Sequence, residues 1–242
     1  MNIEKHTAQE TMEGDGVTVK RLMPVGGLRN YDPFVLWDHF SITPGNGFPD
    51  HPHRGFEAIT YMFSGSMQHT DNLGNQSTVK TGGAQRFTAG SGIIHSEMPG
   101  KDDKSEGIQL WINLPKSLKT IPADYQQADS DVIPVHITNG VTVRTIVGEG
   151  SPVLLNTPVR YEDIALDEGT KHSIHVTEGF RGFLYIVTGK VMISGQVSSA
   201  GEAIFVESPH SLDIDAIDTS RLMVCLGKPH HEPIHQHGPY VD

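Results

Sequence analysis

Short apolar runs separated by turn-forming phrases are the feature that most constrains the fold of this chain. Phrases such as PGNG, DNLGN, AGSG and TNG recur along the sequence, which contains 26 Gly and 15 Pro among 242 residues. Between them the side chains alternate with the period of two that β-strands impose, for example from Phe56 to Phe63 and from Gly107 to Leu114. No long segment shows helical periodicity. The pattern predicts an all-β protein made of sandwiches or barrels.

The segment NLPKSLKTIPADYQQADSDVIP interrupts this strand pattern. It is polar and contains three prolines, a composition typical of a domain boundary. The strand-rich halves on either side carry similar phrases, FEAITYMFSGSMQHTDNLGNQSTVKTGGAQRF in the first and FLYIVTGKVMISGQVSSAGEAIFV in the second, which indicates an internal duplication. We therefore predict two domains, residues 1–130 and residues 131–242.

Charge and cysteine content exclude several classes of function. The formal net charge is -11 with only 18 Lys and Arg, so the sequence disfavours direct binding to nucleic acid. The single cysteine, Cys225, rules out an intrachain disulfide framework and fits a reducing compartment. The first residues lack the apolar region of a secretion signal, and no run is long enough to cross a membrane. We expect a cytoplasmic protein without a membrane partner.

Two short phrases indicate a metal site. In PDHPHRGFE, one continuous strand would point His51, His53 and Glu57 to the same side, and in AGSGIIHSEMPG the same spacing pairs His95 with Glu97. Facing strands would bring three imidazoles and a carboxylate, either Glu97 or Glu57, to one cation. This mixed N/O donor set without thiolates suits Fe(II), Mn(II), Ni(II), Cu(II) or Zn(II) in an open site.

These phrases also carry a family resemblance. GNGFPDHPHRGFE resembles the first cupin motif, and GGAQRFTAGSGIIHSEMP resembles the second. Together with GIQLWINLP and GKPHHEPIHQHGPYV, they make the sequence similar to the pirin family of bicupins over nearly its whole length. The resemblance implies two tandem jelly-roll β-barrels, a single iron in the N-terminal one, and a C-terminal one without a metal site. It implies His51, His53, His95 and Glu97 as ligands, with Glu57 beside them.

The resemblance implies two alternative functions. One is quercetin 2,3-dioxygenase activity, in which a flavonol ring is cleaved with O2 and Glu97 or Glu57 acts as the catalytic proton acceptor. The other is a non-enzymatic protein that senses redox state or metal and regulates a protein partner, as a transcriptional cofactor or a modulator of a metabolic enzyme. Both functions need the same ligands, so the sequence leaves open whether the protein is an enzyme. The family also implies a monomer, with Fe(II) favoured and Mn, Ni, Cu and Zn as alternatives.

The remaining histidines receive structural interpretations. His69 lies on the strand that follows Gly65, from which it could approach the pocket, but a hairpin surface is the favoured location. His172 and His175 fall on opposite faces of a strand, a spacing that does not form a metal site. The C-terminal phrase HHEPIHQHGPY is expected to form a strap stiffened by its prolines.

Overall fold

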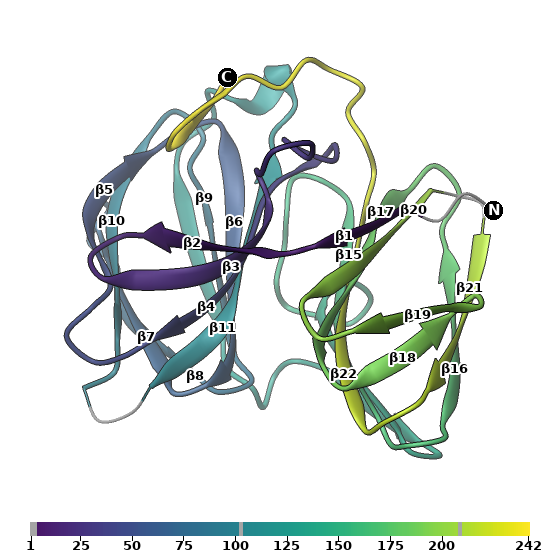
Figure 1. Cartoon of the computed structure of the whole chain (residues 1–242). Coiled ribbons are helices and arrows are strands. Elements are labelled where there is room, and N and C mark those ends of the chain that lie inside the picture. The colour runs from purple at the N-terminus through teal and green to yellow at the C-terminus, as the bar shows by residue number, and fades with distance from the viewer. Residues whose placement is uncertain (1–3, 102–103, 208–209) are drawn as a thin grey trace. The chain divides into compact units, whose positions relative to one another are not determined.

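The described residues of this computed structural model, 4–101, 104–207 and 210–242, form an all-β fold in which turns and loops join the strands, as predicted (Figure 1). The one helical segment among them is the 3-10 helix η1 (Lys116–Leu118). The chain divides into two compact units. The N-terminal unit comprises Gln9–Val132, Leu155–Thr157 and His230–Asp242, and the C-terminal unit comprises Ile133–Leu154, Pro158–Pro229 and the residues before Gln9. A single division at residue 130 does not describe this exchange of chain ends.

The N-terminal unit is built from two antiparallel sheets and a short terminal hairpin. The larger sheet has the order β12-β9-β6-β11-β4-β3-β2, and the smaller sheet has the order β5-β10-β7-β8. The strands are β2 (Gln9–Glu13), β3 (Val17–Met23), β4 (Phe34–Ile42), β5 (Phe48–His53), β6 (Phe56–Ser64), β7 (Ser66–Asp71), β8 (Gln76–Lys80), β9 (Ala84–Thr88), β10 (Ile93–Pro99), β11 (Ser105–Asn113), β12 (Asp124–Ala128), β23 (Gln236–His237) and β24 (Tyr240–Val241).

The C-terminal unit repeats the same two-sheet plan. Its larger sheet has the order β1-β20-β17-β22-β15-β14-β13, and its smaller sheet has the order β16-β21-β18-β19. The strands are β1 (Glu4–Thr7), β13 (Val135–Thr138), β14 (Val141–Val147), β15 (Val159–Leu166), β16 (Lys171–Val176), β17 (Arg181–Thr188), β18 (Lys190–Ile193), β19 (Gln196–Ser199), β20 (Glu202–Glu207), β21 (His210–Ala216) and β22 (Ser220–Gly227). The repeated plan agrees with the internal duplication that the sequence indicates.

Each unit has its own apolar core. In the C-terminal unit, strands of both sheets contribute to one buried cluster that includes Leu184 and Ile214. In the N-terminal unit, one buried cluster includes Phe56, Phe87 and Val241, with Trp111 packed against it. Val241 lies on β24, so the C-terminal segment belongs to the core of the unit that also contains the predicted metal ligands.

A sharp turn at Gly55 separates β5 from β6. Gly55 has φ +84°, and a Cβ atom at this position would lie 1.9 Å from the carbonyl oxygen of Val241, so both backbone conformation and space require glycine. Because the chain turns here, β5 joins the smaller sheet and β6 joins the larger one. The phrase DHPHRGFE therefore spans two strands of different sheets.

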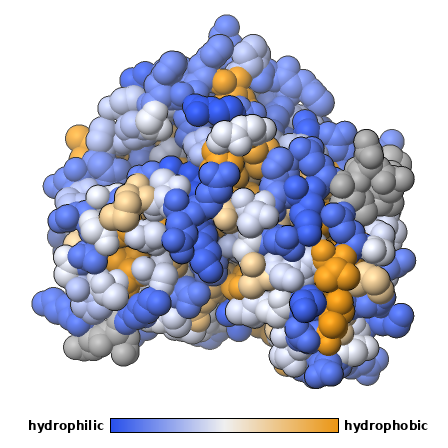
Figure 2. Space-filling model, in the orientation of Figure 1, coloured by the Kyte–Doolittle hydropathy of each residue, from blue (hydrophilic) through white to orange (hydrophobic). Residues whose placement is uncertain are grey.

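The face seen in Figure 2 is largely hydrophilic, with apolar residues in small patches. Within the described part of the chain, no helical segment has the length and apolar character needed to cross a membrane.

Candidate metal centre

Strand β10 holds the centre together because it pairs with β5 on one side and with β7 on the other. In this register His95 lies opposite His51 on β5 and opposite Asp71 on β7. Glu97 lies opposite His69 on β7, and a bulge between His95 and Glu97 shifts the register with β5. Alternation on β10 places His95 and Glu97 on one side, and both are almost completely buried.

Three histidines converge as the spacing predicts. The ring centroids of His51 and His53 are 4.6 Å apart, those of His51 and His95 4.5 Å, and those of His53 and His95 5.0 Å. The Nε2 atoms of His51 and His95 are 3.1 Å apart. One nitrogen from each of the three rings lies within 4.8 Å of the others, so this group has the dimensions to hold one metal ion.

Two backbone carbonyls orient two of these imidazoles. His51 Nδ1 is 2.7 Å from the oxygen of Pro49, and His53 Nδ1 is 3.3 Å from the oxygen of Pro239. A carbonyl oxygen only accepts hydrogen bonds, so Nδ1 carries a hydrogen in both rings, and in the neutral form of each ring the lone pair is on Nε2. Neutral imidazoles held this way are the form that binds metals. The C-terminal segment thus supplies a direct partner to one of the predicted ligands.

The surroundings of His53 and His95 disfavour the charged forms of these two rings. Burial, together with the neighbouring His95 and His51, lowers the pKa of His53 to about 3. The ring of His53 stacks on Phe87 and meets the ring of Trp111 edge-on, so the site offers little to replace water around a charged imidazole. Burial also lowers the pKa of His95. Protonation of His53 and His95 is therefore disfavoured, and the lone pairs of their neutral rings remain available to a metal ion.

Three neutral donors fix the carboxylate of Glu97. Oε1 accepts hydrogen bonds from Thr60 Oγ1 at 2.8 Å and Gln85 Nε2 at 2.6 Å. Oε2 accepts one from Gln109 Nε2 at 2.7 Å. A carboxylate has about four acceptor positions, so Oε2 retains a lone pair. No cation pairs with Glu97 among the described residues, which leaves its charge available to a metal ion.

The structure places Glu57 elsewhere. Its carboxylate accepts hydrogen bonds from the backbone N–H of Asn156 and Thr157, from the side-chain amide of Asn156 and from Thr88 Oγ1. It does not line the cavity beside the histidines. The expected alignment with His51 and His53 assumed one continuous strand, and the turn at Gly55 breaks that strand. Glu57, expected beside the histidines as a pocket or catalytic residue, therefore lies outside this cavity and anchors the segment Leu155–Thr157.

A cavity of about 550 Å³ opens onto the histidines. His51, His53 and Glu97 line one part of it, and Trp111 and Pro239 contribute apolar wall. Its polar lining includes the ion pair between Arg21 and Asp38, whose Nη2 and Oδ2 atoms are 2.6 Å apart, together with Gln109. The cavity is large enough for a small organic molecule.

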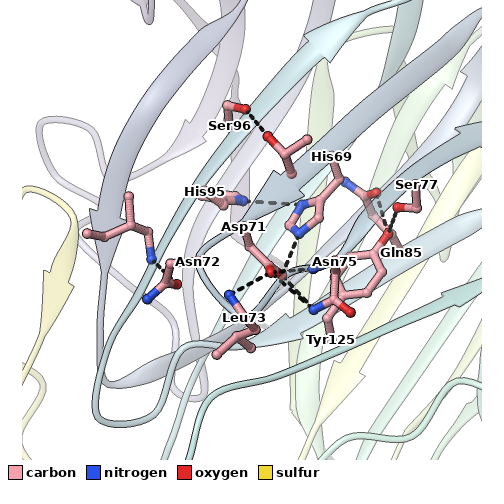
Figure 3. A network of polar contacts seen from close by, with 12 residues as sticks. His69, Asp71, Asn72, Leu73, Asn75, Ser77, Gln85, His95, Ser96 and Tyr125 are labelled. Carbon is pink, nitrogen blue, oxygen red and sulfur yellow. Dashed lines mark hydrogen bonds and ion pairs between the residues drawn. The ribbon is translucent and has the colours of Figure 1, made fainter.

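His69 is the residue that the sequence interpretation missed. Instead of lying on a hairpin surface, it is fully buried, with its Nδ1 atom 3.4 Å from His95 Nδ1 and its Nε2 atom 2.9 Å from Asp71 Oδ2 (Figure 3). The sequence contained a signal, because Met67, His69 and Asp71 alternate on one face of β7 and Met67 is a core residue. His69, His95 and Glu97 form a second group close enough to share a metal ion.

The other histidines have different surroundings. His172 on β16 is half-buried and His175 is exposed. In the C-terminal segment, His230 Nε2 is 2.9 Å from the carbonyl oxygen of Asn113. Both metal-sized groups found among the described residues lie in the N-terminal unit.

Comparison with known proteins agrees with this architecture. The Pirin family profile matches residues 16–112, and the profile of the Pirin C-terminal cupin domain matches residues 161–242. Pirin from Mus musculus is 38% identical over 251 residues, which cover 97% of this chain and 84% of the mouse protein. The chain belongs to the pirin family. A pirin-like protein from Caulobacter vibrioides is 36% identical, with coverage of 96% of this chain and 89% of that protein.

A solved structure with the same architecture carries an enzyme name. The crystal structure of quercetin 2,3-dioxygenase from Acinetobacter baumannii superimposes with a TM-score of 0.92 at 28% identity, and the match covers 98% of this pirin and 90% of that chain. This similarity extends over both units, so the assignment to two cupin domains is confirmed.

Proposed function

We propose that the N-terminal unit of this pirin binds one divalent transition-metal ion through His51, His53, His95 and Glu97. The observation that supports this most directly is the pair of carbonyl-locked rings, His51 and His53, whose Nε2 lone pairs accompany His95 in one compact group. A buried carboxylate without a cationic partner completes the donor set. Fe(II) is our first candidate, and the same donors accept Mn, Ni, Cu or Zn.

We further propose that the protein cleaves a flavonol such as quercetin with O2. When bound, the metal would polarise the hydroxy-ketone of the flavonol and supply the redox chemistry. Trp111 and Pro239 give the cavity apolar walls that suit an aromatic substrate. Glu97 Oε2 carries the single hydrogen bond from Gln109, and we assign it as the atom that would accept the hydroxyl proton once it has detached from the metal. The dioxygenase name of the Acinetobacter structure supports this choice of reaction.

The test is quercetin turnover in air by protein reconstituted with Fe(II). We expect loss of flavonol absorbance together with release of carbon monoxide, and we expect both to disappear in His53→Ala, which lacks one imidazole. Asp131→Asn is a matched control, because Asp131 is exposed and far along the chain from the site. Stoichiometric iron without turnover would refute the dioxygenase proposal while leaving the metal site intact, and unchanged metal retention in His53→Ala would refute the ligand assignment.

A second candidate function is metal-dependent regulation of a protein partner. One contact favours this function, the hydrogen bond from His53 Nδ1 to the oxygen of Pro239. Pro239 belongs to the C-terminal segment, in which Asp242 is exposed and paired with Arg54. Metal bound to His53 would thereby stabilise a surface segment. Hydrogen exchange of the backbone amides of residues 240–242 should slow when metal is added. Equal exchange with and without metal would remove the support for this function.

A further inference from the structure

A chain of three buried side chains runs from the candidate centre into β7. His95 Nδ1 is 3.4 Å from His69 Nδ1, and His69 Nε2 is 2.9 Å from Asp71 Oδ2 (Figure 3). The side chains of His69 and Asp71 have no exposed surface. The ring of His69 stacks on Tyr125 with centroids 4.2 Å apart and an interplanar angle of 19°. These contacts fix the plane of the ring and leave each nitrogen one partner.

Asp71 is held so that it can act only as an acceptor toward His69. Its Oδ1 atom accepts hydrogen bonds from the backbone N–H of Leu73 at 2.9 Å and of Asn75 at 3.0 Å. Its Oδ2 atom accepts from the side-chain amide of Asn75 at 2.9 Å and faces His69 Nε2. Burial acts to raise the pKa of Asp71, but the hydrogen bonds from His69 and Asn75 outweigh it and the pKa is lowered. The carboxylate form is therefore the relevant one.

The direction of each hydrogen bond in this row of side chains follows from Asp71. Because Asp71 accepts, His69 Nε2 carries the hydrogen, and a neutral His69 then has its lone pair on Nδ1. That lone pair faces His95 Nδ1, so His95 donates there and keeps its own lone pair on Nε2. This is the atom that lies 3.1 Å from His51 Nε2. Partners of this kind set the tautomer of metal-binding histidines in proteins.

We infer that His69 and Asp71 are positioning residues that fix the tautomer of His95, so that its Nε2 lone pair points into the metal centre. The inference rests on the proposed metal function. It assigns His69 the role toward His95 that the carbonyls of Pro49 and Pro239 have toward His51 and His53. Here the acceptor is an imidazole, and its own orientation depends on a buried carboxylate.

The most informative variant is Asp71→Asn, which keeps the shape of the side chain, reverses its hydrogen bond with His69 and removes the one that Oδ2 accepts from the Asn75 side chain. The backbone N–H groups of Leu73 and Asn75 require an acceptor at the Oδ1 position, so the new NH2 group must face His69 Nε2. His69 would then carry its hydrogen on Nδ1 and donate to His95. As a result His95 would carry its hydrogen on Nε2 and present N–H to the metal.

The experiment combines two measurements on the full chain. Nitrogen-15 NMR of the metal-free protein at pH 8 reports the tautomer of His95, and Co2+ titration followed by visible absorption reports metal affinity. In the unmodified protein we expect the Nδ1–H tautomer. In Asp71→Asn we expect the Nε2–H tautomer and about 10- to 100-fold weaker Co2+ binding. Asp131→Asn, the same chemical change at an exposed site, should match the unmodified protein in both measurements.

A second variant distinguishes the hydrogen-bond relay from Asp71 through His69 to His95 from a general loss of structure. His69→Phe keeps an aromatic ring against Tyr125 but removes the acceptor for His95, so a mixture of His95 tautomers and weaker Co2+ binding are expected. The Nε2–H tautomer in the unmodified protein, or Co2+ affinity within twofold of it in Asp71→Asn, would overturn the inference. If the unmodified protein shows the Nδ1–H tautomer but binds no Co2+, the proposed metal function fails while the relay stands.

Discussion

Replacing Glu57 by Gln tests whether this carboxylate is structural or catalytic. Glu57 has no exposed surface, and four donor groups reach its oxygens at 2.8–3.2 Å. Hydrogen bonds to a charged group contribute about 1.5–3 kcal/mol each, against about 0.5–1.5 kcal/mol for neutral ones. The amide of Gln also turns one acceptor into a donor that faces buried N–H groups of Asn156 and Thr157. Part of the lost stability is recovered, because burying a neutral amide costs less free energy than burying a carboxylate.

The expected result is a loss of about 2–4 kcal/mol in the free energy of unfolding, measured by urea denaturation of the metal-free protein. Co2+ affinity at a temperature where the variant is folded should stay within twofold of the unmodified protein, because Glu57 does not touch the three histidines. Glu149→Gln, an exposed matched change, should alter stability by less than about 0.5 kcal/mol. A stable Glu57→Gln protein that has lost metal binding or turnover would refute the structural assignment.

Three further predictions follow from the described contacts. Because burial lowers the pKa of His53 to about 3, the unfolded chain binds a proton there below pH 6.5 that the folded protein excludes. The free energy of unfolding of the metal-free protein should therefore fall with decreasing pH by up to about 1.4 kcal/mol per pH unit. Urea denaturation from pH 7 to pH 4 measures this slope, and His53→Leu should reduce it. Lys119 Nζ donates to the oxygens of Gly55, Asn113 and Val241; Lys119→Met should cost about 1–3 kcal/mol and accelerate hydrogen exchange at Val241, and unchanged exchange would contradict this role. Burial raises the pKa of the Cys225 thiol, so a thiol reagent should label it only after denaturation, and rapid labelling of the native protein would contradict its burial.

The strands and the three histidines follow from the sequence because they depend on local patterns. The period of two from Phe56 to Phe63 predicts a strand, and β6 spans Phe56–Ser64. The His-x-His and His-x-Glu spacings place side chains on one face of a strand wherever the strand is continuous. His51, His53 and His95 meet this condition, since β5 and β10 are regular up to the bulge that follows His95.

Glu57 and His69 show where local patterns fail. Glu57 would share a face with His53 only on an unbroken strand, but the chain turns at Gly55, where the carbonyl of Val241, far away in the sequence, leaves no room for a Cβ atom. His69 was treated alone, whereas its burial comes from the pairing of β7 with β10 and from stacking on Tyr125 of β12. The partner that Pro239 provides to His53 likewise arises from tertiary packing. Contacts between distant segments determine these features, and no short window of sequence contains them.

Anomalous diffraction from crystals grown with Co2+ tests the central claim most directly. The account predicts one strong peak per chain, about 2.0–2.2 Å from the Nε2 atoms of His51, His53 and His95 and from an oxygen of Glu97. A peak bound by His69, His95 and Glu97 without His51 and His53 would contradict both the ligand set and the relay. A peak confined to the histidines of the C-terminal segment, or no peak at all, would contradict the proposed metal centre.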